Sequence, residues 1–357
     1  MKVLNLSIDK KILEKDSAVA KRIVWFEEIV EKYIILVPFL EKKELKLSEN
    51  VFAYGSGGKN KVRQFFSVWK TASEVLKKEK FDVITTQDPY FTGMLGLFLT
   101  KKYNIPLEVQ VHGLGEVGFL KRILRKFILK RADGIRAVGL RLKKEIMAMG
   151  LSEEKIIVIP VYTGTDVQVN TPKTYPSGEF IFLFVGRLVP VKNIQMQIEA
   201  MKILKEQSVR VKLWIVGTGP EEKRLKKLVS QYGLEDVVEF FGWKNTKELE
   251  EFYKKAHCLL LTSKSEGWGM VVLEAGAYGM PVIMTDVGLV GEIITDDVNG
   301  KIVSCNNTME LVKIMEQIIK DKNLFEKLSR NILNTIREFP TRKEILQKYL
   351  SGWGKIV

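Results

Sequence analysis

The sequence alternates short apolar runs with longer segments of helical pattern, and it does so twice. The first half contains KVLNLSI, IILVPF, LEVQVHG and IIVIPV, and the second half contains FIFLFVG, VKLWIVG, CLLLTS and PVIMTD. Near-continuous apolar strands joined by helices indicate parallel sheets that are covered on both faces, as in doubly wound folds. We therefore expect an α/β chain with two Rossmann-like domains.

A linker separates the two halves. The segment NTPKTYPSG has the composition of an interdomain connection, because it combines two prolines and a glycine with polar neighbours. We expect a Rossmann-like N-terminal domain at 1–170, a Rossmann-like C-terminal domain at 171–340, and a closing helix and tail at 341–357 that can return to the N-terminal domain. Ligands bind beyond the carboxyl ends of parallel strands, so two such domains facing each other would form a cleft.

The composition restricts the class of protein. Of the 357 residues, 46% are hydrophobic, which is an ordinary globular proportion. No apolar run reaches the ~18–20 residues of a membrane helix, and the N-terminus becomes charged too early for a secretory signal. We therefore expect a cytoplasmic protein. The two histidines and two cysteines lack metal-ligand spacing, so we predict no metal site.

The charge is unevenly distributed. Residues 1–170 carry a net charge of +10 out of +14 for the whole chain. Such an excess favours an anionic partner, which could be a phosphorylated metabolite, a nucleic acid or an acidic lipid headgroup.

The stretch SEGWGMVVLEAGAYG places two glutamates, Glu266 and Glu274, eight positions apart in an apolar run. We interpret it as the exit loop of a buried strand followed by a short helix. The backbone N–H groups around Gly269, Met270 and Val271 would form an anion site at the start of that helix. A buried carboxylate without a partner costs several kcal/mol, so Glu274 should contact either ligand hydroxyls or a nearby lysine.

Two further motifs follow predicted strands. FLFVGRLVPVKN places Arg187 and Lys192 beyond a strand end, and this pair suits a diphosphate, because arginine offers a planar fork and lysine a mobile charge. Two solvated basic side chains are the alternative interpretation. VGTGPEEKRL places Gly217 and Gly219 before a helix, where they form either a plain tight turn or a loop that borders a ligand.

These motifs occur in a characteristic order. GRLVPVKN, VGTGPEEKRL, EFFGW, SKSEGWGMVVLEAGAYGMPVI, DVGLVGEII and NGKIV follow one another over residues 180–303. In this order they resemble the C-terminal half of the retaining GT-B glycosyltransferases of family 4. The resemblance implies a nucleotide-sugar donor in the C-terminal domain and an acceptor in the N-terminal domain.

The resemblance also implies roles for the motif residues. Arg187 and Lys192 would grip the donor diphosphate, and the amides after Gly269 would contact the distal phosphate. Glu274 would hold the ribose hydroxyls, while Glu266 would lie against the donor sugar. The loop with Gly217 and Gly219 would border the nucleotide.

The N-terminal half resembles the family less. His112 ends the strand of VQVHG, where related enzymes present a histidine to the donor sugar. Gln87 and Asp88 also follow a strand, and we predict an acceptor-facing pair there. No glycine precedes Gly55, so the usual glycine-rich first loop is absent, and Ser17 or its neighbour Asp16 should cap the next helix with its amides facing a phosphate.

The segment FLKRILRKFILKRA predicts a basic amphipathic helix. Its apolar stripe should face the core, and its basic residues should lie outward, where an anionic membrane would attract them by ~1 kcal/mol each. The predicted membrane contacts are Lys121, Arg122, Arg125 and Lys126. An ordinary surface helix is the alternative.

We conclude that the sequence predicts a retaining glycosyltransferase of the hexosyltransferase type with the GT-B fold. It should move a sugar from a nucleotide-diphosphate sugar to a glycan or lipid-linked acceptor without metal or cofactor. It should be cytoplasmic, or peripheral on the inner face of the cell membrane. The alternatives are a GT-B glycan phosphorylase and a basic nucleic-acid-binding protein, although the basic helix lacks the interleaved aromatics that the latter needs.

Overall fold

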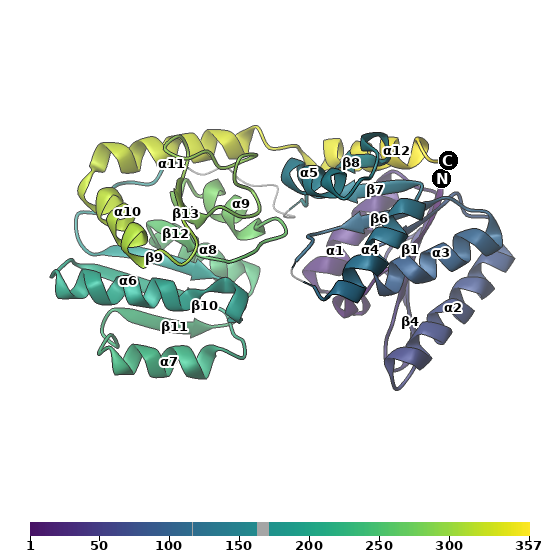
Figure 1. Cartoon of the computed structure of the whole chain (residues 1–357), viewed down its shortest axis with the longest axis horizontal. Helices are drawn as coiled ribbons and strands as arrows, with labels where there is room; N and C mark the ends of the chain where they lie inside the picture. The colour runs from purple at the N-terminus through teal and green to yellow at the C-terminus, as the bar shows by residue number, and fades with distance from the viewer. Residues whose placement is uncertain (116, 163–170) are drawn as a thin grey trace. The chain divides into compact units, whose positions relative to one another are not determined.

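The computed structural model describes residues 1–115, 117–162 and 171–357 (Figure 1). The chain forms two compact units, which we call the N-terminal unit, residues 1–164 with 340–357, and the C-terminal unit, residues 165–339. Each unit contains a largely parallel sheet with helices packed on it. The expected α/β fold with two Rossmann-like domains is confirmed.

The sheet of the N-terminal unit has the order β3-β4-β2-β1-β5-β6-β7-β8. Its strands are β1 (Lys2–Leu6), β2 (Lys32–Val37), β3 (Lys42–Lys46), β4 (Val51–Ser56), β5 (Val83–Thr86), β6 (Leu107–Val111), β7 (Gly134–Ala137) and β8 (Ile156–Val158). Neighbouring strands pair in parallel except β3, which is antiparallel to β4. The chain moves outward from β1 to β2 and then returns to β5 on the other side, so the sheet has a topological switch point between β1 and β5.

The helices of this unit connect the strands and cover the sheet. They are η1 (Lys10–Leu13), α1 (Ala18–Val24), η2 (Trp25–Glu28), α2 (Lys61–Lys78), α3 (Phe91–Tyr103), α4 (Phe119–Arg131), α5 (Leu140–Ala148), η3 (Glu153–Lys155) and α12 (Arg342–Gly354).

The C-terminal helix α12 belongs to the N-terminal unit, as the fold prediction anticipated (Figure 1). Thr341 and Glu344 form a capping box at its start, which satisfies backbone donors of the first turn. Trp353 is fully buried, and its ring centroid lies 5.8 Å from that of Phe26. The aromatic packing therefore secures the last residues of the chain to strands and helices formed by the first.

The C-terminal unit has a parallel sheet with the order β11-β10-β9-β12-β13-β14. Its strands are β9 (Phe180–Val185), β10 (Val211–Val216), β11 (Val238–Gly242), β12 (Cys258–Leu261), β13 (Val282–Thr285) and β14 (Lys301–Val303). Its helices are η4 (Pro190–Lys192), α6 (Ile194–Glu206), α7 (Glu222–Gln231), α8 (Thr246–Lys255), α9 (Met270–Ala277), α10 (Thr308–Lys320) and α11 (Lys322–Arg337). The strand order reverses between β9 and β12, which makes their carboxyl ends the expected ligand site.

The orientation predicted for the basic helix is wrong at Arg125. This side chain is 7% exposed, and its guanidinium donates hydrogen bonds to the carbonyl of Leu114 and to the Tyr90 hydroxyl, so burial is compensated by acceptors from outside the helix. The buried face of α4 runs through Arg125, Ile128 and Leu129, one helical turn apart. The predicted apolar stripe is consequently turned toward solvent over part of its length, with Phe119, Leu120, Ile123 and Phe127 between 42% and 80% exposed.

Candidate functional site

The loops that leave β9 and β12 meet at the switch point of the C-terminal unit. Lys192 Nζ lies 2.5 Å from Glu266 Oε1, and the Ser263 hydroxyl donates to the same oxygen at 2.6 Å. The backbone N–H of Lys264 donates to the carbonyl of Val191 at 2.8 Å, which joins the two loops. Two residues that are 74 positions apart in the sequence therefore form a partly buried ion pair, and Arg187 is exposed on the same β9 loop.

The glycines of the β10 loop allow a close backbone approach. A Cβ atom on Gly217 would lie 1.8 Å from the carbonyl oxygen of Gly186, and one on Gly219 would lie 2.3 Å from that of Leu188. Gly217 also has a φ of +136°, which side chains rarely tolerate. The loop thus packs directly on the β9 loop that carries Arg187.

Helix α9 begins at Met270 without a side-chain cap, because its N-cap residue is Gly269, with a φ of +98°. Val271, in the first turn, is partly buried. A neighbouring loop presses on this helix start, since a Cβ on Gly288 would lie 2.6 Å from the carbonyl oxygen of Trp268. The start of an α-helix carries partial positive charge, so it is suited to an anion.

Glu274 receives a hydrogen bond from Tyr253, whose Oη lies 2.7 Å from Glu274 Oε2. Desolvation raises the pKa of Tyr253 well above its usual value, and the adjacent carboxylate raises it further. The phenol therefore stays protonated and donates to the glutamate. The donor in this contact is a tyrosine, which the sequence did not indicate, and contact of Glu274 with ligand hydroxyls stays a prediction. Sequence reasoning missed Tyr253, because a tyrosine on the distant helix α8 carries no spacing signal.

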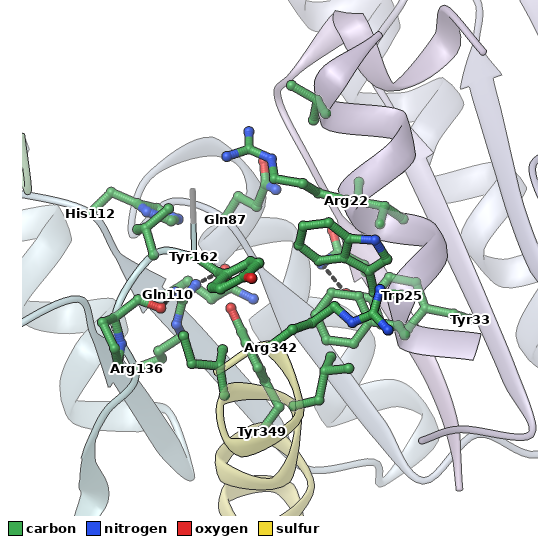
Figure 2. A pocket seen from close by; sticks show the side chains of 18 residues that line it. Arg22, Trp25, Tyr33, Gln87, Gln110, His112, Arg136, Tyr162, Arg342 and Tyr349 are labelled. Atoms are coloured by element: carbon green, nitrogen blue, oxygen red, sulfur yellow. Dashed lines mark hydrogen bonds between the residues drawn. The ribbon is translucent and has the colours of Figure 1, made fainter. Parts of the chain in front are cut away.

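Gln87 and His112 in the N-terminal unit line a pocket of about 160 Å³ (Figure 2). The Ser7 hydroxyl donates to Gln87 Oε1 at 2.5 Å. Desolvation at the strand ends lowers the pKa of His112, and the charge of Arg136 lowers it further, although the side chain keeps solvent-exposed surface. The imidazole is therefore neutral at pH 7.

The other two predicted acceptor residues, Asp88 and Ser17, accept hydrogen bonds at the starts of helices α3 and α1. Asp88 accepts from the N–H of Tyr90 at 2.7 Å and from the Thr92 hydroxyl at 2.6 Å, which secures the start of α3. Ser17 accepts from the N–H of Ala20, so the predicted cap of α1 is confirmed. Neither residue lines the pocket. Contact of Asp88 and Ser17 with an acceptor stays a prediction.

Metal-binding clusters and membrane-spanning helices are both absent from the described residues. No group of three or more His, Cys, Asp or Glu side chains there is arranged to hold a metal ion. Within the same residues, no helix has the length and apolar character needed to cross a membrane.

Comparisons with known proteins agree with this architecture. Residues 170–335 match the family model "Glycosyl transferases group 1", and residues 38–168 match "Glycosyltransferase Family 4". An uncharacterized glycosyltransferase of Methanocaldococcus jannaschii is 27% identical over 89% of this chain and 88% of its own. The D-inositol 3-phosphate glycosyltransferase of an Arthrobacter species is 27% identical over 65% of this chain and 61% of its own.

Solved structures share the fold. Sucrose-phosphate synthase from Thermosynechococcus elongatus superposes with a TM-score of 0.83 at 18% identity, covering 100% of this chain and 99% of its own. HepE of Anabaena in complex with UDP gives 0.80 at 18% identity, covering 99% and 100%. Fold and matches together define a glycosyltransferase of the GT-B class. More specifically, the chain belongs to the GT-B glycosyltransferases of family 4.

Proposed function

We propose that this glycosyltransferase is a retaining, metal-independent enzyme of the hexosyltransferase type that uses a nucleotide-diphosphate sugar. The observation that carries the proposal is the Lys192–Glu266 ion pair at the β9/β12 switch point, with Arg187 on the same loop and the start of α9 after Glu266. Two cationic side chains and a helix start suit a diphosphate. HepE, which shares the fold, was solved in complex with UDP, and this supports a nucleoside diphosphate as part of the donor.

The charge that develops during transfer explains these roles. The acceptor hydroxyl oxygen bonds to the anomeric carbon, the bond from that carbon to the distal phosphate oxygen breaks, and the proton passes to the departing phosphate. Arg187, Lys192 and the α9 amides would stabilise the growing phosphate charge, a contribution often worth about 3–4 kcal/mol per donor. Attack from the face that the leaving group vacates would retain the anomeric configuration.

Glu266 and Glu274 would act at opposite ends of the donor. Glu266 holds the Lys192 ammonium before the donor arrives and would then face the sugar. Glu274, fixed by Tyr253, would accept the ribose hydroxyls. The predicted contact of His112 with the donor sugar stays a prediction.

Calorimetry with a nucleoside diphosphate in excess EDTA tests donor binding. We expect unchanged affinity with and without the chelator, because side chains supply the cations. A panel of nucleotide sugars, followed by NMR of the product's anomeric proton, then tests transfer and retention. Loss of binding on chelation contradicts metal independence, and an inverted product contradicts retention.

We also propose a glycan or lipid-linked acceptor, reached at the inner face of the cell membrane from the cytoplasm. Helix α4 supports this, because Phe119, Leu120 and Ile123 are exposed beside the exposed cations Lys121 and Arg122. In helices that lie at a membrane interface, apolar side chains typically insert into the lipid while neighbouring basic side chains contact the lipid phosphates.

Sedimentation with anionic and neutral vesicles tests this surface. The variant Lys121→Gln/Arg122→Gln/Lys126→Gln should lose binding to anionic vesicles, and wild-type binding should fall between 0.1 M and 1 M salt. Arg125 stays unchanged in this variant because it is buried. Salt-sensitive binding to oligonucleotides instead of vesicles would favour the nucleic-acid alternative.

A further inference from the structure

The pocket of the N-terminal unit is built for a small ligand. Its volume of about 160 Å³ is below the ~300–1,000 Å³ of pockets for drug-sized ligands. Residues from β1, β6, β7, α1 and α12 line it, so distant parts of the chain converge on one cavity (Figure 2).

The lining of this pocket is cationic. It contains Arg22 from α1, Arg136 from β7 and Arg342 from α12, and within the described residues it contains no aspartate or glutamate (Figure 2). Arg342 is ion-paired with Glu28 at 3.0 Å and lies over the Trp25 ring, so it occupies a defined position. A cavity lined by one sign of charge concentrates ligands of the opposite sign, so it favours an anion.

Hydrogen bonds hold Arg136 rigidly. Its Nη1 donates to Gln110 Oε1 at 3.0 Å, and its Nε and Nη2 donate to the carbonyl of Ile159 at 3.2 Å and 3.0 Å. Nη2 also donates to the carbonyl of Pro160 at 3.5 Å. Gln110 in turn donates to the Thr85 hydroxyl at 2.9 Å, and Thr85 donates to Glu108 at 2.6 Å. Arg136 is only 3% exposed, and these hydrogen bonds fix its guanidinium so that one N–H of Nη1 is directed before a ligand arrives, which reduces the entropy cost of binding.

The pocket also contains an acceptor atom without a partner. Asn5 is 4% exposed, its Nδ2 donates to the Tyr33 hydroxyl at 2.9 Å, and its Oδ1 has no hydrogen-bond partner among the described residues. Leaving a buried acceptor unsatisfied costs about 1–3 kcal/mol. A ligand hydroxyl that donates to Asn5 Oδ1 would remove this cost.

We propose that the pocket binds the polar end of the acceptor, a polyol that carries a phosphate or a carboxylate, either as a free molecule or as the headgroup of a lipid. The charged group contacts Arg22 and Arg136, and a hydroxyl donates to Asn5. That the bound anion is the acceptor rests on the proposed function. That the pocket binds an anion follows from its lining and does not depend on that function. Gln87 and His112 line the same cavity, so a second hydroxyl of the ligand reaches the carboxyl ends of β5 and β6.

Calorimetry on the full chain with glycerol 3-phosphate and with glycerol tests the proposal. Arg22→Gln should weaken the binding of glycerol 3-phosphate at least 10-fold. Arg141→Gln on α5 is the matched control, because it removes the same charge from the same unit outside the pocket and should keep wild-type affinity. Since Arg136 is buried, Arg136→Gln is a secondary variant and is compared only after thermal unfolding shows an intact fold.

A free phosphate and a phospholipid headgroup share this chemistry, so soluble short-chain phosphatidylglycerol and phosphatidylcholine, which offer no membrane surface to α4, form a second arm. The proposal is supported if glycerol 3-phosphate, or phosphatidylglycerol alone, binds to wild type and Arg22→Gln weakens that binding. The probe that binds then shows whether the phosphate is free or belongs to a lipid headgroup. The proposal is overturned if glycerol binds as tightly as glycerol 3-phosphate, or if Arg22→Gln and Arg141→Gln change the affinity equally. It is also overturned if Arg187→Gln, and not Arg22→Gln, abolishes the binding of glycerol 3-phosphate. Turnover of a nucleotide sugar, measured in parallel, reports separately on the proposed function.

Discussion

The replacement of Gly217 by alanine should destabilise the C-terminal unit far more than the same replacement at Gly233. At Gly217 the new Cβ would lie 1.8 Å from a backbone oxygen of Gly186, and the φ of +136° is strained for alanine. Backbone strain of this kind costs about 1–3 kcal/mol, and forced displacement of packed atoms costs about 1–3 kcal/mol more. We therefore expect a loss of about 2–6 kcal/mol in the free energy of unfolding, which is a large part of the ~5–15 kcal/mol of a typical domain.

Gly233 is the matched control. Its φ is +62°, also unfavourable for alanine, but no atom lies within 4 Å of the position that a Cβ would take. The expected loss is then the conformational term alone, about 1–2 kcal/mol. The two variants therefore separate the close approach of the β9 and β10 loops from the cost of a positive φ.

Urea unfolding with hydrogen-exchange mass spectrometry measures both effects, because peptides from β9 and β10 assign the transition to the C-terminal unit. With a slope of about 1–3 kcal/mol per molar urea, a loss of about 4 kcal/mol moves the midpoint by about 2 M. Nucleoside diphosphate affinity should fall with Gly217→Ala, since the displaced loop carries Arg187. Equal midpoints for Gly217→Ala and Gly233→Ala would refute the reasoning.

Three further predictions concern single side chains. Glu274→Ala should weaken nucleotide binding, while Glu266→Ala should mainly lower turnover, and calorimetry with steady-state kinetics would contradict this if both changes reduced affinity equally. Tyr253→Phe removes one hydrogen bond to a carboxylate, typically worth about 1.5–3 kcal/mol, and should weaken nucleotide binding without altering the fold by circular dichroism. Desolvation lowers the pKa of His257 to about 4, and its Nδ1 accepts from the N–H of Ile181. As pH falls, the unfolded chain therefore takes up the His257 proton before the folded chain does, so the free energy of unfolding should fall between about pH 6.5 and about pH 4. A flat pH profile of the free energy of unfolding, unchanged in His257→Gln, would contradict this.

The sequence by itself determined the fold class and the C-terminal motif region. The apolar strand runs, the helical segments and the glycine positions depend on neighbouring residues, so their patterns are visible along the chain. The strand-end positions of Arg187, Lys192 and Glu266 follow from the same local patterns, because parallel strands place their exit loops at one edge of the sheet. Ser17 as a helix cap was equally local, since a cap contacts a backbone N–H only three residues away.

Only the tertiary structure decided which distant side chains meet. Arg125 was expected to face outward with its basic neighbours, but it is buried because Tyr90 and Leu114, from other segments, supply its acceptors. Tyr253 reaches Glu274 only because the fold brings α8 within hydrogen-bond distance of α9.

The pocket of the N-terminal unit depends most strongly on tertiary structure. It combines Asn5 from the first strand with Arg136 from β7 and Arg342 from the last helix. No periodicity links residues so far apart in the sequence, because hydrophobic patterning specifies which face of an element is buried and not which element covers it. The return of α12 to the N-terminal unit, secured by the burial of Trp353, closes the cavity and brings its third arginine.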